Sequence, residues 1–258
     1  MHRTPGTPRR EPQPAAAAYS TQVTPSHRSS GTVRSPDRRP QSGPLFESAQ
    51  FALSVAELAQ INVARLALLP EVAFVGRSNA GKSSVINVLT NQRRLAFASK
   101  TPGRTQLLNF FAISRRNAAG ALEPCAYLVD LPGYGFARVD AATRSRWDQL
   151  VGGYLRTRRM LAGVVLVVDA RRGLLPADEE LLAWMAGRDR PEVLHLHVLL
   201  NKADQLNTRE HRQALAAAER HAEALPMPTS VQLFSALTRE GIEELREVIA
   251  HVLQSPRV

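Results

Sequence analysis

The most informative segment of the sequence is Gly76-Arg77-Ser78-Asn79-Ala80-Gly81-Lys82-Ser83, because it matches the pattern G-x-x-x-x-G-K-[ST] in full. An apolar run ends at Val75 just before it, and a helical pattern begins at Lys82. In that setting the glycines allow backbone N–H groups to point at phosphate oxygens, at the positive end of a helix. The Lys82 ammonium brings a point charge to the β and γ phosphates, and the Ser83 hydroxyl is a ligand for Mg²⁺. The segment therefore predicts a nucleoside triphosphate site and leaves the base undecided.

Short β-rich runs alternate with amphipathic stretches around this segment, which favours an α/β fold with a mostly parallel sheet and helices on both faces. Strands are expected at Val72–Val75, Leu107–Ser114, Ala126–Val129, Val164–Val168, Leu196–Leu200 and Val231–Phe234. Helices are expected at Lys82–Thr90, Thr143–Met160, Ala177–Ala186, Arg209–Ala224 and Ile242–Leu253. A polar turn joins the second and third strands, so we expect a hairpin that adds one antiparallel strand at the edge of the sheet.

The tetrapeptide Asn201-Lys202-Ala203-Asp204 follows an expected strand and indicates guanine as the base. A carboxylate such as that of Asp204 accepts two hydrogen bonds, and guanine offers its N1–H and 2-amino donors side by side. Adenine presents an acceptor at N1, so an ATP site would require Asp204 to play no part. Asn201 is expected to join the phosphate loop to the base edge, and the stem of Lys202 to lie over the ring. Open α/β sheets bind ligands at the carboxyl ends of their strands, where this tetrapeptide stands.

Three further segments fall in the order that such a site needs. Asp130-Leu131-Pro132-Gly133 has the form D-x-x-G, in which the aspartate holds Mg²⁺ through water and the glycine N–H meets the γ phosphate. Phe234-Ser235-Ala236 ends the last expected strand and offers backbone groups to guanine O6. Between the phosphate loop and the aspartate, either Thr101 or Thr105 has the hydroxyl to close on Mg²⁺ in the triphosphate state.

This ordered set resembles the translation-factor class of P-loop GTPases with the Ras-like fold, and within it the EngB-type (YihA/YsxC) branch. The resemblance rests on the phosphate loop extended to Ser84, on Thr101-Pro102-Gly103-Arg104-Thr105-Gln106, on Asn109-Phe110-Phe111, on Asp130-Leu131-Pro132-Gly133-Tyr134-Gly135 and on Asn201-Lys202-Ala203-Asp204. The second and fourth of these segments are the specific ones. The resemblance covers roughly residues 46–254 and leaves out the first 44 residues.

The resemblance implies residue roles and a cellular role that the residues alone do not supply. Thr105 rather than Thr101 becomes the Mg²⁺ ligand beside Ser83, and the nucleotide is lined by Gly103, Arg104, Thr105, Gln106 and Leu107. The implied activity is GTP hydrolysis to GDP, as a switch late in assembly of the large ribosomal subunit. The implied partners are the subunit precursor, rRNA and ribosomal proteins. We expect a monomeric, cytoplasmic protein that acts away from membranes, with a link to cell growth, the cell cycle and septation.

The position after Asp130-x-x-Gly133 holds Tyr134, where Ras-like enzymes use a glutamine to orient the attacking water. No arginine is assignable as a finger, so Lys82 and Thr105 are the expected supports of the transition state and slow turnover is expected. Asn79 stands where related GTPases bind K⁺, which supplies the charge of a finger; alternatively, Asn79 only shapes the loop. The ribosomal particle is a second candidate activator. The alternative function is a GTP/GDP-binding nucleotide sensor that barely hydrolyses GTP.

Composition limits the other classes of protein. The 258 residues contain one cysteine, which excludes an intrachain disulfide and a multi-cysteine metal site. No apolar stretch approaches the ~20 residues that span a bilayer, so we expect a soluble protein. The 33 basic residues exceed the 23 acidic ones, and only three of the 33 are lysines. Codon bias explains the excess of arginine over lysine, and the net charge of +10 favours polyanionic partners such as nucleic acid.

The charge divides the chain at about residue 44. Residues 1–44 hold seven arginines against two acids and are rich in Pro, Ser and Thr, so we expect a disordered extension. A solvated tail, an RNA-contacting tail, an organellar targeting segment and a start codon placed too early are the open interpretations. Residues 45–258 form the expected GTP-binding domain.

A second basic segment, Arg138–Met160, follows the D-x-x-G loop. It is either a solvated helix face or an rRNA-facing patch, and it includes Arg144, Arg146, Arg156, Arg158 and Arg159. A membrane-trafficking GTPase is disfavoured, because Gln254–Val258 lacks a prenylation cysteine. His195 and His197 alternate on an expected strand without carboxylates beside them, which predicts a packing role rather than metal binding.

Overall fold

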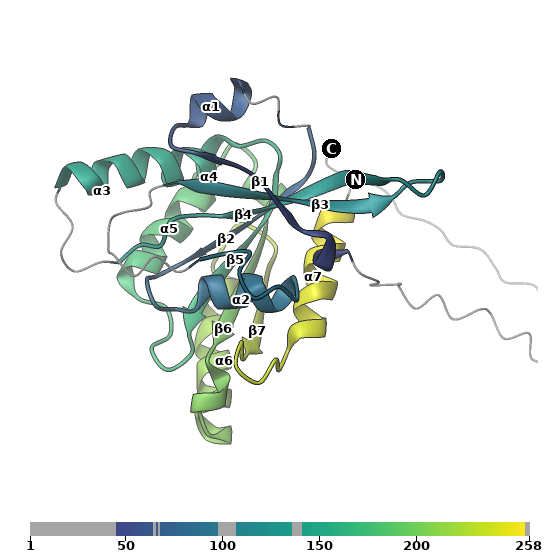
Figure 1. Ribbon diagram of the computed structural model, residues 1–258. Helices are drawn as coiled ribbons and strands as arrows, with labels where there is room; N and C mark the ends of the chain where they lie inside the picture. Colours follow the sequence, from purple (N-terminus) through teal and green to yellow (C-terminus); the bar gives the residue numbers. More distant parts are fainter. Residues whose placement is uncertain (1–44, 64–65, 67, 98–106, 136–140, 256–258) are drawn as a thin grey trace, which may run out of the picture. The chain divides into compact units, whose positions relative to one another are not determined.

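The computed structural model describes residues 45–63, 66, 68–97, 107–135 and 141–255, which form a central sheet with helices around it (Figure 1). The sheet order is β1-β3-β4-β2-β5-β6-β7. The strands are β1 (Gln50–Val55), β2 (Glu71–Gly76), β3 (Leu108–Arg116), β4 (Leu122–Asp130), β5 (Leu161–Asp169), β6 (His195–Asn201) and β7 (Thr229–Phe234). All six expected strands are present. The expected extension 1–44 lies outside the described residues.

The strand β3 runs antiparallel to both of its neighbours, β1 and β4, and the other neighbouring pairs are parallel. The predicted hairpin of β3 and β4 is confirmed, but β3 is not at the edge as expected. The edge is β1, which pairs Gln50 with Ala112 and Val55 with Leu108. Most of its side chains are exposed, so β1 lacks the apolar alternation by which a strand is predicted from sequence.

Two separate apolar cores lie on the two faces of the sheet, because the apolar strand residues alternate between them. The helices α2 (Lys82–Leu89) and α7 (Ile242–Gln254) bury Ile86 and Ile249 against one face. The other face is covered by α1 (Leu58–Val63), α4 (Gly153–Thr157), α5 (Pro176–Ala186) and α6 (Thr208–Glu223). The predicted α/β class, with one antiparallel strand and helices on both faces, is therefore confirmed.

The long helix expected at 143–160 is divided into three pieces. They are α3 (Ala141–Trp147), the π-helical turn η2 (Asp148–Gly152) and α4, which ends at Thr157. A Cβ at Gly152 would lie 3.2 Å from the Trp184 ring, so this part of the chain packs directly on α5. A π-helical turn adds a residue to the helix and changes which side chains face the sheet.

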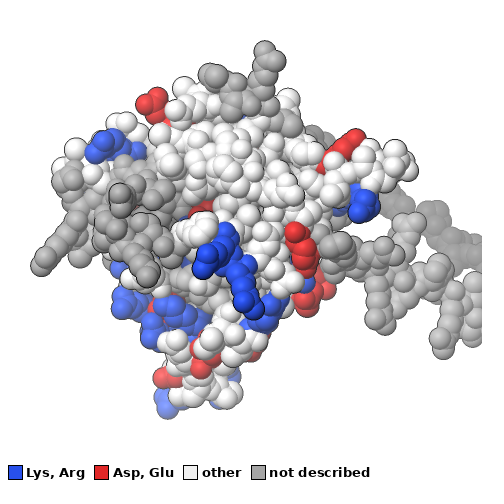
Figure 2. All heavy atoms as spheres, in the orientation of Figure 1, with Lys and Arg blue, Asp and Glu red and all other residues white. Residues whose placement is uncertain are grey.

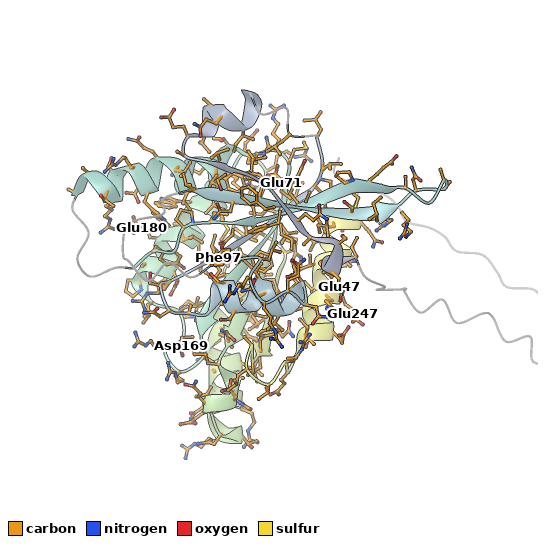
Figure 3. The ribbon with its side chains drawn as sticks, viewed as in Figure 1. Glu47, Glu71, Phe97, Asp169, Glu180 and Glu247 are labelled. Atoms are coloured by element: carbon orange, nitrogen blue, oxygen red, sulfur yellow. The ribbon has the colours of Figure 1, made fainter. Side chains whose placement is uncertain are left out.

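The parallel strands place the sequence motifs together at the carboxyl ends of the strands. Glu71 begins β2 and Asp169 ends the parallel neighbour β5, so the two carboxylates mark opposite ends of the sheet (Figure 3). The phosphate loop, the D-x-x-G loop and the tetrapeptide at 201–204 all follow strands that end on the Asp169 side. Within the described residues, no helix is both long and apolar enough to cross a membrane.

Candidate nucleotide-binding site

The phosphate loop depends on two glycines for its shape. Gly81 precedes α2 with φ 96°, a left-handed conformation that glycine adopts without steric cost, and a Cβ there would collide with the side chain of Asn201. A Cβ at Gly76 would lie 2.6 Å from the carbonyl oxygen of Val167 on β5. Asn79, at φ 66°, is the non-glycine residue type that best tolerates this region. The loop is therefore held in a curled form by local backbone geometry and by its fit against β5 and β6.

Asn201 joins the phosphate loop to the loop after β7. Its Nδ2 donates to the Ala80 carbonyl at 2.8 Å, and its Oδ1 accepts from the Ala236 backbone N–H at 3.2 Å. The side chain of Asn201 is buried, so both contacts are shielded from water. Beside it, Lys202 Nζ donates to the Asn79 carbonyl at 2.6 Å. One short segment thus brings together residues from three motifs that are far apart in the sequence.

The tetrapeptide also fixes the carboxylate that is expected to select the base. Asp204 is exposed, and its Oδ1 accepts from the hydroxyl of Ser235 at 2.5 Å. Ser235 is fully buried, and its oxygen also accepts from the Thr238 backbone N–H at 3.1 Å. Phe234 packs in the apolar core on the α2 and α7 face. Ala203 is buried beneath the turn.

Two of the predicted ligands for Mg²⁺, Asp130 and Ser83, lie within the described residues. Asp130, at the end of β4, is buried, and its Oδ1 accepts from Lys82 Nζ. Ser83 is half-buried in the first turn of α2. A carboxylate and a hydroxyl oxygen suit a hard cation such as Mg²⁺, so this donor set fits the ion. The predicted residues Gly103, Arg104, Thr105 and Gln106, together with Thr101, lie outside the described residues, and Leu107 is half-buried just before β3.

The D-x-x-G loop packs against the phosphate loop. Leu131 is buried in the core, and the Pro132 carbonyl accepts from Trp147 Nε1 at 3.1 Å. A Cβ at Gly133 would lie 3.4 Å from the Gly76 carbonyl oxygen. The backbone N–H of Ser78 donates to the Tyr134 carbonyl at 2.9 Å. The two loops are therefore in direct backbone contact.

Tyr134 points into the protein and not toward the phosphates. Its ring is buried, and its hydroxyl donates to Asp178 Oδ1 at 2.5 Å. Burial, and then the neighbouring Asp178, hold the pKa of Tyr134 well above its usual range, so the phenol stays protonated. Burial also raises the pKa of the Asp178 carboxyl. The sequence shows Asp178 as a residue of the first turn of a helix, which is no sign of a contact with the loop.

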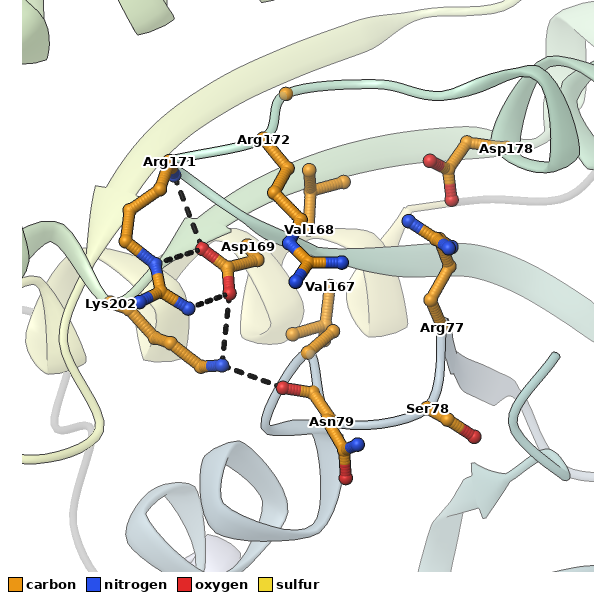
Figure 4. A pocket seen from close by; sticks show the side chains of 12 residues that line it. Arg77, Ser78, Asn79, Val167, Val168, Asp169, Arg171, Arg172, Asp178 and Lys202 are labelled. Carbon is orange, nitrogen blue, oxygen red and sulfur yellow. Dashed lines mark hydrogen bonds and ion pairs between the residues drawn. The ribbon is translucent and has the colours of Figure 1, made fainter. Parts of the chain in front are cut away.

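A pocket lies beside the phosphate loop (Figure 4). Like Asp178, the carboxylate of Asp169 in this pocket was not predicted from the sequence to belong to the site. Asp169 accepts from Arg171 Nε at 2.8 Å and from Lys202 Nζ at 2.9 Å. The hydrogen bonds from Arg171 first, and then those from Lys202, hold the pKa of Asp169 well below its usual range. Asp169 therefore stays ionised and fixes Lys202 over the loop. Asp178, Arg77 and Arg172 line the same pocket.

The arginines expected as one surface patch have different partners. Arg158 is largely buried and donates from Nε to both carboxylate oxygens of Glu71 at 3.0 Å. Arg156 lies over the Trp184 ring, and Arg144 pairs with Glu180 on the surface. Arg158 therefore fits neither the solvated helix face nor the rRNA-facing patch, since its charge balances the buried carboxylate of Glu71. Figure 2 shows basic side chains gathered on the lower part of one face, below a largely uncharged area around β1.

Comparison with known proteins agrees with this geometry. A family model described as a 50S ribosome-binding GTPase matches residues 71–202. Two curated relatives are each called a probable GTP-binding protein EngB. The one from Cupriavidus taiwanensis is 44% identical over 218 residues, which cover 82% of this chain and 88% of the relative. The one from Burkholderia pseudomallei is 45% identical over 210 residues, which cover 80% and 90%.

Solved structures share the fold at lower identity. The crystal structure of a probable GTP-binding protein EngB is 24% identical and covers 71% of this chain and 98% of that one, with a TM-score of 0.51. Era in complex with MgGDPNP and nucleotides 1506–1542 of 16S ribosomal RNA is 20% identical and covers 74% and 58%, with a TM-score of 0.54. The sequence matches over most of the chain, together with the geometry of the phosphate loop and of residues 201–204, show the family: this chain belongs to the EngB family of GTP-binding proteins.

Proposed function

We propose that the protein hydrolyses GTP to GDP as a conformational switch in assembly of the large ribosomal subunit. One observation carries the nucleotide part: the buried Asn201 amide holds the phosphate loop at Ala80 and the loop after β7 at Ala236. This contact supports a site in which Lys82 binds the phosphates and Asp204 binds the base. The motifs would then form a single nucleotide site at the carboxyl ends of the parallel strands, where α/β sheets bind ligands.

The residues that would hold Mg²⁺ are Ser83 and, through water, Asp130, with Thr105 as the remaining ligand. When bound, the ion neutralises charge that develops on the phosphate oxygens. Lys82 now contacts Asp130, and a triphosphate would take over that contact. Asp130 would then be available to the hydration shell of the ion. This exchange makes the D-x-x-G loop respond to the nucleotide. The other nucleotide contacts are proposed for 76–83, 103–107, 130–133, 201–204 and the backbone of 234–236.

Slow intrinsic turnover follows from the place of Tyr134. Its hydroxyl is engaged by Asp178 inside the protein, so it does not orient a water at the γ phosphate. K⁺ near Asn79 or the ribosomal particle would supply the missing charge. The same observation favours the alternative of a binding module that holds GTP or GDP with little hydrolysis. Multiple-turnover phosphate release, measured with and without large-subunit precursor, separates the two functions: release that stays stoichiometric in both conditions supports the binding module.

The ribosomal role is supported by the family model, whose description is a 50S ribosome-binding GTPase. We propose rRNA and ribosomal proteins of the large-subunit precursor as partners of a cytoplasmic monomer, with growth, cell cycle and septation as downstream processes. A sucrose-gradient profile of cells depleted of the protein tests this. Accumulation of an incomplete large subunit is expected, and a normal profile rejects the role.

A further inference from the structure

Tyr134 follows the D-x-x-G segment directly, and its side chain lies in the core of the protein. The Tyr134 ring is buried and lies 5.5 Å from the ring of Trp147 on α3. Its hydroxyl reaches Asp178 on α5, a residue that is 1% exposed. A buried tyrosine requires a partner for its hydroxyl, and this one is a carboxylate, which makes the hydrogen bond a strong one. The loop is thus tethered to α5 through a single side chain.

The carboxylate at the other end of the tether is itself fixed. Asp178 Oδ2 accepts from the Leu175 backbone N–H at 2.8 Å in the first turn of α5, which leaves Oδ1 for Tyr134. The side chain of Arg77 in the phosphate loop points toward Asp178 across the pocket (Figure 4), and its positive charge favours the ionised carboxyl. Asp178 therefore faces the D-x-x-G loop and the phosphate loop at once.

The same tyrosine also sets the distance between those two loops. Its carbonyl accepts from the Ser78 N–H of the phosphate loop, while its hydroxyl is held by Asp178. A second contact, from Trp147 Nε1 to the Pro132 carbonyl, holds the loop on α3. Trp147 in turn lies 5.6 Å from Trp184 on α5. The position of the Asp130–Gly133 loop against the phosphate loop therefore depends on Trp147 of α3 and Asp178 of α5, two residues that are not themselves among the proposed nucleotide contacts.

We propose that Asp178 is a positioning residue for GTP hydrolysis: by holding the Tyr134 hydroxyl, it returns the Asp130–Gly133 loop to one place against the phosphate loop. The proposal rests on the proposed hydrolysis and deepens it. It assigns Asp178 no contact with the substrate. Small displacements of a group that orients the reacting atoms change rates far more than they change binding, so the effect belongs in kcat.

The test replaces Tyr134 by Phe, which keeps the ring on Trp147 and removes the hydroxyl. We expect kcat to fall about tenfold and the Kd for GTP to stay within about twofold of the original protein. Asp178→Asn retains a carboxamide oxygen and should lower kcat less. The double variant Tyr134→Phe with Asp178→Asn should lose no more kcat than Tyr134→Phe alone, because both changes act on the same contact. An unchanged kcat in Tyr134→Phe, or additive losses in the double variant, overturns the proposal.

A matched control exists at the other end of the sheet. Tyr154 is also fully buried, and its hydroxyl donates to the buried carboxylate of Glu71 at 2.7 Å. Tyr154→Phe removes the same kind of hydrogen bond without touching the D-x-x-G loop. It should lower the thermal unfolding midpoint as Tyr134→Phe does and leave kcat within about twofold. Equal losses of kcat in the two variants would mean that only stability was affected, and the proposal fails.

Fluorescence separates this proposal from the proposed hydrolysis. The chain has two tryptophans, so Trp184→Phe leaves Trp147 as the single tryptophan reporter beside Pro132 and Tyr134. In that background, Trp147 emission should differ between GDP and a non-hydrolysable GTP analogue, and Tyr134→Phe should reduce this difference. An undiminished difference overturns the tether. Absence of turnover in the original protein overturns the proposed hydrolysis instead, and the emission comparison still decides the tether.

Discussion

Among single residues, the lysines are the clearest indication of the candidate nucleotide site. The chain has three lysines among 33 basic residues, and two of them, Lys82 and Lys202, contact carboxylates beside the phosphate loop. Lysine is a compact charge on a flexible stem, which suits a phosphate or a carbonyl approached along one direction. The motifs predicted Lys82 and Lys202 as functional residues. They did not predict Asp130 and Asp169 as their partners.

Asp204→Asn should abolish the preference for guanine. The carboxamide has one acceptor and one donor, so it cannot accept from both N1–H and the 2-amino group. Loss of a hydrogen bond to a charged group corresponds to about tenfold to 100-fold weaker GTP binding. Titration with GTP, ATP and XTP measures the change. Preserved GTP preference would instead support a site in which Asp204 plays no part.

Asn79 should make turnover depend on the monovalent cation. If its side chain helps to bind K⁺, phosphate release in KCl should exceed that in NaCl at equal ionic strength, and Asn79→Ala should remove the difference. The left-handed backbone at Asn79 supports the alternative, in which the residue only shapes the loop. Asn79→Gly is the control, because glycine keeps that conformation and lacks the side chain. Equal rates in both salts for the original protein reject the K⁺ site.

At the scale of elements, strands were predicted better than helices and edges. The six strands with apolar runs were all found, because burial of both faces of a sheet requires apolar residues along the strand. The edge strand β1 was missed, since its exposed side chains give no such signal. The division of 141–157 into α3, η2 and α4 was also missed, because a π-helical turn depends on the packing of Gly152 and Gly153 against other helices.

Polar side chains are buried between strands β6 and β7, and one of them, His197, should make stability depend on pH. His197 is 2% exposed and contacts the Ser230 hydroxyl at 2.8 Å and Gln232 Oε1 at 3.0 Å. Burial lowers the pKa of His197 from 6.5 to about 4. Between those two values the unfolded chain binds a proton that the folded protein excludes. The free energy of unfolding should therefore fall as pH drops from 6.5 toward 4.

The expected loss is on the order of 2 kcal/mol between pH 7 and pH 5 from this group alone. Burial also lowers the pKa of the neighbouring His195, which acts in the same direction. Urea unfolding at the two pH values measures the change. In His197→Gln, the number of protons taken up on unfolding between these pH values should fall by about one. An equal slope in the variant contradicts the assignment.

For the molecule as a whole, one ion pair, Glu71 with Arg158, is largely buried and contributes to the stability of the core. Glu71 is fully buried at the start of β2, and its carboxylate accepts from both Tyr154 and Arg158. A reversal of Arg158 cannot report on a surface, because the variant would leave a buried charge unpaired. The exposed members of the predicted patch are Arg144, Arg146, Arg156 and Arg159.

Arg158→Ala should therefore destabilise the protein by about 3–5 kcal/mol, as breaking a buried pair does. Arg159→Glu, one residue away and exposed, should change stability by less than about 0.5 kcal/mol. If the exposed arginines contact rRNA, Arg146→Glu with Arg159→Glu should reduce co-sedimentation with large-subunit precursor while GTP affinity is kept. Unchanged co-sedimentation identifies these arginines as a solvated face.

The fold class, the phosphate loop and the tetrapeptide proposed to select the base could all be predicted from the sequence. Each depends on chemistry within a few neighbouring residues: glycine at a left-handed φ, a lysine at a helix start, a carboxylate after a strand. The tertiary structure alone decided the partners of Tyr134, Lys202 and Arg158, which are 44, 33 and 87 residues away along the chain. Those contacts join segments that only the packed fold brings together, and a local pattern carries no information on which distant carboxylate will lie beside a given side chain.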